Sequence, residues 1–371
     1  MTTGAWQFGA HIHMTNTGKS RRQFLAALGV SGAGFLLANG RSAAQSAAAN
    51  PRAINLHHHF VSPAYIKALA AREGRHTAGY TTWFALDQLK NYSPAKDVED
   101  MDRAGVATSV LSCTTPSVWF GNPEESRGLA RELNEYGARL VSDHKGRFGL
   151  FAVLPLPTVE DSLREIEYAF NTLKADGVGL MTSYGNHWLG DPAFQPVFDE
   201  LNRRNAIVYT HPIDAPCCQD IQPGVNPPTI EYNTDTSRAI FSLLNGAATR
   251  YANIRFIFSH GGGTMPSLIQ RFGIGAADTI ADVLARPAEP NSRLYHLRRF
   301  YYDTAQSTNP VQMQGLKTVA GASQIVFGDD YPFGAGPLRH LQGLQKCGFN
   351  AEELRGIHRE NALRILPQYR G

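Results

Sequence analysis

Histidine and aspartate gather at the ends of four short apolar segments of the sequence. The first segment ends in the triplet His57-His58-His59, and the others end in His211, His260 and the pair Asp329-Asp330. Neutral imidazole suits zinc or a similar divalent metal, and three imidazoles with one carboxylate leave a coordination position open for water or substrate. These residue types at four segment ends therefore indicate a catalytic metal site rather than a structural one.

The triple histidine is divided between two faces if its segment is a strand, because successive side chains of a strand point in opposite directions. Alternation puts Ile54, Leu56 and His58 on one face, and Asn55, His57 and His59 on the other. We expect the apolar face to pack against helices, so that His57 and His59 lie inside and bind one ion together. His58 then has a structural role or a hydrogen bond to a helix.

The other candidates are assigned by the chemistry of their surroundings. Gly328 shares a face with Asp330 and leaves room beside a metal, so we favour Asp330 over Asp329 as the ligand. His211 is the best third imidazole. His260 heads a glycine-rich turn and can also serve as a ligand, but we prefer it for proton transfer, because histidine titrates near neutral pH. No residue is assigned to substrate binding.

Eight apolar, strand-like runs, mostly separated by helix-like segments, must position these side chains. They are 53–59, 106–114, 147–155, 177–183, 206–212, 254–262, 299–305 and 324–330. Such alternation predicts an α/β protein with a parallel sheet, and eight units predict a closed (β/α)8 TIM barrel in a single catalytic domain. The carboxyl ends of barrel strands converge on the active site, and the candidate residues lie there. We expect the segments of roughly 60–100 and 212–235 to be irregular loops above the barrel.

Composition narrows the partners. The chain of 371 residues is 43% hydrophobic and 18% charged, with a formal net charge of +3 and no large basic cluster. We therefore expect a small-molecule substrate and no nucleic acid. The fourth strand-like run, Gly-Val-Gly-Leu-Met-Thr-Ser, contains no lysine that could bridge two metals, so a single ion is expected.

The first 49 residues differ in kind from the rest. Arg21-Arg22 precede an apolar run, 24–38, that is short and glycine-rich for a membrane span, and Ala47 to Ala49 form an Ala-x-Ala site. This pattern predicts a cleaved twin-arginine signal peptide over 1–49, an exported, periplasmic enzyme over 50–371, and no membrane span in the mature chain. A cytoplasmic protein with an apolar amino-terminal helix is the alternative.

Four motifs in order resemble the amidohydrolase superfamily. They are His57-x-His59, His211-Pro212, Ser-His-Gly-Gly-Gly at 259–263 and Gly-Asp-Asp-Tyr-Pro-Phe at 328–333. The sequence from 53 to 365 is similar to the decarboxylase branch, which includes aminocarboxymuconate-semialdehyde and resorcylate-type decarboxylases, and above all to its methylsalicylate decarboxylase-like members. The resemblance implies one divalent metal held by His57, His59, His211 and Asp330, catalytic acid–base chemistry by His260, and a homodimer.

Two positions depart from that pattern. Asn55 stands where an aspartate often precedes the His-x-His pair, and Asp329 stands where the branch usually has serine or threonine. We expect the first change to alter support for the ligands. The second adds a negative charge near the metal, which would raise the pKa of a neighbour or disfavour an anionic substrate.

The leading hypothesis is a metal-dependent, non-oxidative decarboxylase of a small aromatic or unsaturated carboxylic acid, with zinc as the metal and manganese as the alternative. His260 or Asp330 would assist protonation of the carbon that loses CO2. The second hypothesis is a hydrolase of a lactone, ester or amide, in which Asp330 takes a proton from metal-bound water. Aromatic loop residues that could hold a planar ring are Trp83, Phe84, Trp119, Phe120 and Trp188. The nearest loop candidates for binding a distal carboxylate are Arg72 and Arg75.

Overall fold

The structure is a computed structural model that describes residues 52–72, 76–77, 80–81, 86–213, 228–274 and 279–370. The predicted signal peptide, 1–49, lies outside the described residues, and so do Arg75 and the side chains of Trp83 and Phe84. No helix in the described part of the chain is long and apolar enough to cross a membrane.

Eight parallel strands form one sheet in the order of the chain. They are β1 (Ala53–His59), β4 (Val106–Ser112), β5 (Phe148–Val153), β6 (Gly177–Met181), β9 (Ile207–His211), β10 (Arg255–Phe258), β11 (Tyr301–Asp303) and β12 (Ile325–Val326). The last strand returns to the first, where Leu56 N donates to Phe327 O over 2.9 Å and His59 N donates to Tyr331 O over 2.8 Å. The predicted TIM barrel is confirmed.

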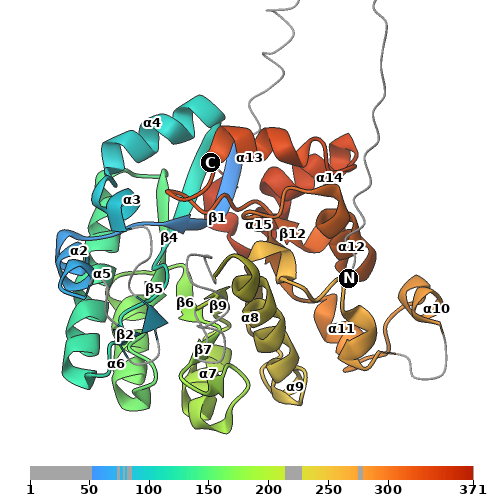
Figure 1. Cartoon of the computed structure of the whole chain (residues 1–371), viewed down its shortest axis with the longest axis horizontal. Coiled ribbons are helices and arrows are strands. Elements are labelled where there is room, and N and C mark those ends of the chain that lie inside the picture. Colours follow the sequence, from blue (N-terminus) through green and yellow to red (C-terminus); the bar gives the residue numbers. More distant parts are fainter. Residues whose placement is uncertain are drawn as a thin grey trace, which may run out of the picture. The chain divides into compact units, whose positions relative to one another are not determined.

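Helices surround the strands on the outside (Figure 1). The longer ones are α2 (Pro63–Ala70), α4 (Pro94–Ala104), α5 (Pro123–Asp143), α6 (Val159–Asn171), α7 (Gln195–Arg203), α8 (Pro228–Leu243), α12 (Pro310–Ala320) and α13 (Pro337–Leu344). Shorter ones are α3 (Leu86–Lys90), α9 (Ala247–Arg250), α10 (Ile280–Ala285), α11 (Arg293–Leu297), α14 (Ala351–Arg355) and α15 (Asn361–Ile365). α13 packs against α4, which brings the end of the barrel beside its beginning.

The segment 60–100 is not the irregular loop expected from the sequence, because it contains α2, α3 and the first part of α4. Both α2 and α4 begin with a serine followed by proline at the first helical position, which is a strong start signal. The Ser62 hydroxyl accepts a hydrogen bond from Tyr65 N over 3.1 Å and so caps α2. These short helices were missed because their apolar periodicity is brief.

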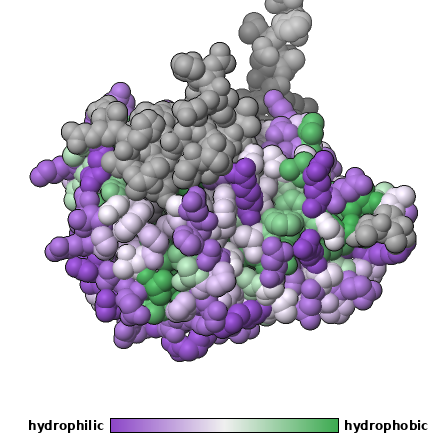
Figure 2. All heavy atoms as spheres, turned by 60° about the horizontal axis from the view of Figure 1, so that its bottom comes forward, coloured by the Kyte–Doolittle hydropathy of each residue, from purple (hydrophilic) through white to green (hydrophobic). Residues whose placement is uncertain are grey.

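Two buried clusters fill the molecule. The larger lies between strands and helices, and the smaller lies inside the barrel, where Val110, Phe151 and Ile257 meet Leu363 and Leu366 from the end of the chain. α15 and the residues after it thus close one end of the barrel, and the functional side chains are left at the other. The exposed large hydrophobic residues of the described part are Phe241, Leu268, Val311 and Leu338. On the face in Figure 2, hydrophilic side chains prevail and hydrophobic ones occupy limited areas.

Candidate metal centre

An extra residue in β1 decides which histidines point into the barrel. Asn55 is level with Ser109 of β4, and the next paired position matches His58 with Leu111. Three steps along β1 therefore correspond to two along β4, which is the count of a β-bulge. A bulge of one residue reverses the alternation of side chains from that point on.

Because of this reversal, the apolar side chains of Ile54 and Leu56 and the two predicted ligand histidines of β1 point to the same side, into the barrel. Ile54 and Leu56 lie in the cluster inside the barrel, so the prediction that they pack against helices is wrong. After the bulge, His57 and His59 also point inward, as predicted, while Asn55 does not share their face. Simple alternation predicted the inward direction of His57 and His59, but it did not include the bulge that produces this direction, because the sequence does not show the bulge.

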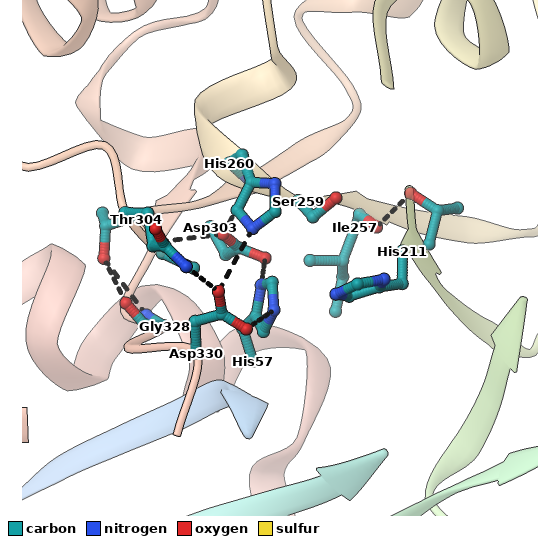
Figure 3. Close-up of polar contacts among 12 residues, drawn as sticks. His57, His211, Ile257, Ser259, His260, Asp303, Thr304, Gly328 and Asp330 are labelled. Carbon is teal, nitrogen blue, oxygen red and sulfur yellow. Dashed lines mark hydrogen bonds and ion pairs between the residues drawn. The ribbon is translucent and has the colours of Figure 1, made fainter. Parts of the chain in front are cut away.

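The structure brings the four predicted ligands together at the carboxyl ends of the strands. One ligand atom from each of His57, His59, His211 and Asp330 lies within 4.8 Å of every other, and all four residues are buried. The Nε2 atoms of His57 and His59 are 3.1 Å apart, and each is 3.0 Å from Asp330 Oδ1. Figure 3 shows His57 beside Asp330, with His211 facing them from β9.

The second nitrogen of each imidazole has an oxygen partner. His57 Nδ1 lies 2.7 Å from Asp303 Oδ2, His211 Nδ1 lies 2.7 Å from Pro212 O, and His59 Nδ1 lies 3.3 Å from Ser112 O. Because these oxygens accept, each Nδ1 donates to its partner and each Nε2 faces the cluster. With a cation bound, each Nε2 would offer it a lone pair, and without one His57 itself carries the positive charge at the centre. The donor set fits one divalent metal ion.

The electrostatics of the cluster agree with this interpretation. Burial disfavours a charged His57, but Asp303 and Asp330 outweigh burial and raise the pKa of His57 to about 10. Burial lowers the pKa of His211 well below its usual value, and neighbouring histidines lower it further. Burial also works against an ionised Asp330, yet the positive charge of His57, together with the imidazoles of His260 and His59 beside the carboxylate, holds the pKa of Asp330 well below its usual range. The site therefore favours one positive charge at its centre.

His260 follows β10 directly and lies at the edge of the cluster. Its Nε2 atom is 3.6 Å from Asp330 Oδ2. Its φ of +52° is in the left-handed region, which a non-glycine residue adopts only when neighbours hold it there. The holding group is Asp303 Oδ1, which accepts a hydrogen bond from His260 N over 2.9 Å.

Asp303 is a functional residue that the sequence reasoning missed. One of its carboxylate oxygens fixes the ring of His57, and the other fixes the backbone of His260 (Figure 3). The signal was present, because Asp303 is a carboxylate at the end of the seventh strand-like run. Gln306 was missed as well, and its side-chain amide donates a hydrogen bond to Asp330 Oδ2.

Glycine at position 328 makes the close approach of two elements possible. A Cβ atom there would lie 2.6 Å from the Cβ of His57 and 3.0 Å from the Cβ of Asp303. The glycine thus leaves room for His57 and Asp303 to approach each other, and the prediction that it leaves room beside a metal stays a prediction. Asp330, however, does not extend a strand, because β12 ends at Val326 and Asp330 has a φ of +64°.

Asp329 and His58 lie behind the cluster rather than in it. Asp329 Oδ1 accepts hydrogen bonds from Asn55 Nδ2 over 2.7 Å and from Tyr331 N over 3.0 Å. His58 Nε2 lies 2.9 Å from both carboxylate oxygens of Asp97 on α4, so the prediction that His58 bonds to a helix is confirmed. The extra negative charge of Asp329 is engaged by these donors and does not face the ligand atoms.

The loop residues proposed for substrate contact have other partners. Arg72 forms an ion pair with Glu125 at 2.5 Å, and its guanidinium lies 4.2 Å from the centre of the Phe120 ring. Trp188 is half-buried under the guanidinium of Arg238, 5.8 Å from the ring centre. Among the described residues, two aromatic rings lie beside the cluster: Tyr209, whose centre is 5.3 Å from that of His57, and Phe333, whose centre is 5.9 Å from that of His59.

Comparison with known proteins agrees with this geometry. The profile of a family described as amidohydrolase matches residues 54–368. The chain is 33% identical over 336 residues to the decarboxylase YanB of Aspergillus niger, covering 85% of this chain and 88% of that one. It is also 33% identical over 328 residues to the 6-methylsalicylic acid decarboxylase of Penicillium expansum, covering 86% and 97%.

The fold has a counterpart among solved structures. The crystal structure of 5-carboxyvanillate decarboxylase LigW from Sphingomonas paucimobilis superimposes with a TM-score of 0.72. The two chains are 21% identical, and the match covers 85% of this chain and 99% of that one. At this level of identity the likeness concerns the fold.

Proposed function

This chain belongs to the amidohydrolase family, and on that premise we propose that it is a metal-dependent, non-oxidative decarboxylase of a small aromatic carboxylic acid. Two relatives that are 33% identical over most of this chain are named decarboxylases. The name of one, 6-methylsalicylic acid decarboxylase, points to a hydroxybenzoate, in which a hydroxyl oxygen lies next to the carboxylate. Such a pair of oxygens suits the open position of a three-histidine, one-carboxylate site.

We assign His57, His59, His211 and Asp330 as the ligands of one divalent cation. When bound, such a cation supplies positive charge that orients the substrate carboxylate and stabilises negative charge on the adjacent oxygen. Zinc suits this donor set, and manganese is the alternative. The other residues prepare the ligands, since Asp303 and Ser112 hold the rings of His57 and His59 with Nε2 directed at the cluster.

His260 is the group that we assign to proton transfer. As the carbon–carbon bond to the carboxylate breaks, CO2 leaves and the electron pair stays on the ring carbon. His260 donates a proton to that carbon, and the pair becomes the new carbon–hydrogen bond. Asp330, 3.6 Å from the imidazole, accepts or returns a proton during this exchange and is the second candidate for the donor. No electrons leave the substrate, so no redox cofactor is needed.

The observation that carries the proposal is the position of His260 at the edge of the buried four-residue cluster. A proton donor there can reach the ring carbon that carries a carboxylate bound at the open position. The same residues would also serve the hydrolysis of a lactone, ester or amide by activated water, and the names of the relatives favour decarboxylation.

A panel assay tests the proposal. Metal-loaded protein is incubated separately with hydroxybenzoates and with lactones, and CO2 and acid release are recorded independently. We expect CO2 from at least one ortho-hydroxybenzoate, loss of activity after chelation, and recovery with zinc or manganese. Acid released from a lactone, with no CO2 from any hydroxybenzoate, would overturn the proposal.

Export of the enzyme is a further part of the proposal. The paired arginines Arg21-Arg22, the apolar run over 24–38 and the Ala-x-Ala site support twin-arginine secretion. In a bacterial host that has this pathway, the double substitution Arg21→Lys with Arg22→Lys should retain the protein in the cytoplasm. Equal periplasmic amounts of the wild type and the variant would contradict twin-arginine export.

A further inference from the structure

Four buried residues that give no atom to the metal cluster form a hydrogen-bonded network directly behind it. We propose that this rear network, made of Asn55, His58, Asp97 and Asp329, is a positioning device that sets the spacing of the metal ligands. It acts on the β1 bulge and on the loop after β12. The inference rests on the proposed metal site and deepens it.

The side chain of Asn55 spans the bulge. Its Oδ1 accepts a hydrogen bond from His57 N over 3.1 Å, and its Nδ2 lies 2.7 Å from Asp329 Oδ1 and 3.0 Å from His58 Nδ1. The pairing with β4 is interrupted at this point, so the amide supplies hydrogen bonds that a regular strand would make with its neighbour. Asn55 therefore holds the reversal that turns His57 inward.

Asp329 stabilises the loop after β12, which carries the ligand Asp330. Its Oδ1 atom also accepts a hydrogen bond from Tyr331 N, and the residue between these two is the ligand Asp330. Asp330 has a φ of +64°, a conformation that its surroundings must stabilise. Asp330 N donates to His57 O over 3.0 Å, so the two ligands are linked through their backbones in front of the network.

His58 and Asp97 anchor the network to a helix. Because both oxygens of Asp97 only accept, His58 Nε2 donates to them, and its Nδ1 lies 3.0 Å from Asn55 Nδ2 and 3.4 Å from Asp329 Oδ1. The ring of Tyr331 stacks on His58 with centres 4.8 Å apart and planes 3° apart. All four network residues are at most 1% exposed. Each of the four side chains thus has at least one hydrogen-bond partner within the network, and buried polar networks of this kind rigidify the site that they support.

The contact between Asn55 and Asp329 permits an exchange experiment. Asn55→Asp alone places a second carboxylate against Asp329 Oδ1. Asp329→Asn alone keeps an oxygen at the Oδ1 position, and with it both hydrogen bonds, because its NH2 group takes the place of Oδ2. In the double variant Asn55→Asp with Asp329→Asn, the new amide at position 329 donates to the new carboxylate at position 55, so the repulsion is relieved at the expense of the hydrogen bond from Tyr331 N. A residue pair that matters only for bulk stability would not recover ligand geometry in this way.

Cobalt(II) binding to metal-stripped protein is the readout, because its visible absorption reports ligand geometry without catalysis. We expect Asn55→Asp to bind cobalt about 10-fold or more weakly, Asp329→Asn to lose less because both of its hydrogen bonds survive, and the exchange variant to bind cobalt more tightly than Asn55→Asp, with a spectrum nearer to that of the wild type. Asp161→Asn is the matched control, since Asp161 is buried on α6 and pairs with Arg164 outside the network. It should bind cobalt like the wild type.

Cobalt binding by Asn55→Asp like that of the wild type, or a folded exchange variant that binds no better than Asn55→Asp, would overturn the inference. If Asn55→Asp does not fold, Asp97→Asn replaces it. This variant should bind cobalt more weakly than the wild type while its thermal unfolding midpoint stays the same. A wild type that binds cobalt but releases no CO2 would refute the proposed reaction, while the affinity comparison would still decide on the network.

Discussion

Asp303→Asn tests the link between the orientation of an imidazole and metal binding. In the wild type, Asp303 Oδ1 accepts backbone hydrogen bonds from His260 N and Ala305 N, both over 2.9 Å. Asparagine keeps this oxygen, so its NH2 group must take the place of Oδ2, 2.7 Å from His57 Nδ1. Two donors then face each other. His57 can relieve the conflict only by moving its proton to Nε2, which removes the lone pair that a metal needs.

The magnitude follows from the bond that is reversed. A hydrogen bond to a charged group contributes about 1.5–3 kcal/mol, and 1.4 kcal/mol corresponds to a factor of about ten in affinity. Asp303→Asn should therefore weaken zinc binding about 10- to 100-fold. Because the two backbone hydrogen bonds survive, the thermal midpoint of the metal-free protein should change little.

Competition with a chromophoric chelator measures the affinity, and thermal unfolding of the metal-free protein measures the stability. Asp303→Ala is the comparison, because it removes the acceptor of both backbone donors and should lower the thermal midpoint more than asparagine does. Zinc affinity of Asp303→Asn within twofold of the wild type would refute the reasoning about the proton on His57.

Three other expectations can be checked with the same protein. Gly328→Ala forces a Cβ to within 2.6 Å of the Cβ of His57, so zinc affinity should fall about tenfold, and wild-type affinity would contradict the packing argument. His57→Ala should lose bound metal, whereas His260→Asn should retain metal and lose CO2 release; loss of metal from both would contradict the separate roles. Burial lowers the pKa of His358 from 6.5 to about 4. Between these two pH values the unfolded chain binds a proton at His358 and the folded protein does not, so the free energy of unfolding falls as the pH drops below 6.5. Between pH 7.5 and 5 the loss is about 2 kcal/mol, and His358→Leu should abolish it in urea titrations; the same loss in the variant would exclude His358 as its source.

The sequence was sufficient to predict the barrel and the four converging ligands, because both depend on repeated local patterns. Eight apolar runs recur at regular intervals, and polar residues at their ends must meet where parallel strands end. Asp330 lies in the cluster and Asp329 does not, but strand alternation is not the reason. In the structure, the left-handed backbone at Asp330 directs that side chain.

Other features depend on contacts between distant residues. The bulge in β1 is stabilised by the hydrogen bond between Asn55 and Asp329, which are 274 positions apart. The local sequence around either residue therefore does not predict the bulge. The helices over 63–70 and 86–90 are too short to show a clear period, and Ser62-Pro63 was the signal to follow. Asp303 could have been found, because it meets the rule that identified the other site residues, a polar side chain at a strand end.

The most direct test of the central claim follows the labelled carboxyl carbon of a substrate. Metal-loaded protein in D2O is given carboxyl-13C ortho-hydroxybenzoate, and the mixture is followed by 13C NMR and mass spectrometry. We predict labelled bicarbonate and a phenolic product with one deuterium on the carbon that carried the carboxylate, with neither formed after chelation. Label that stays in a carboxylate, or bicarbonate formed equally by the metal-free protein, would contradict the account.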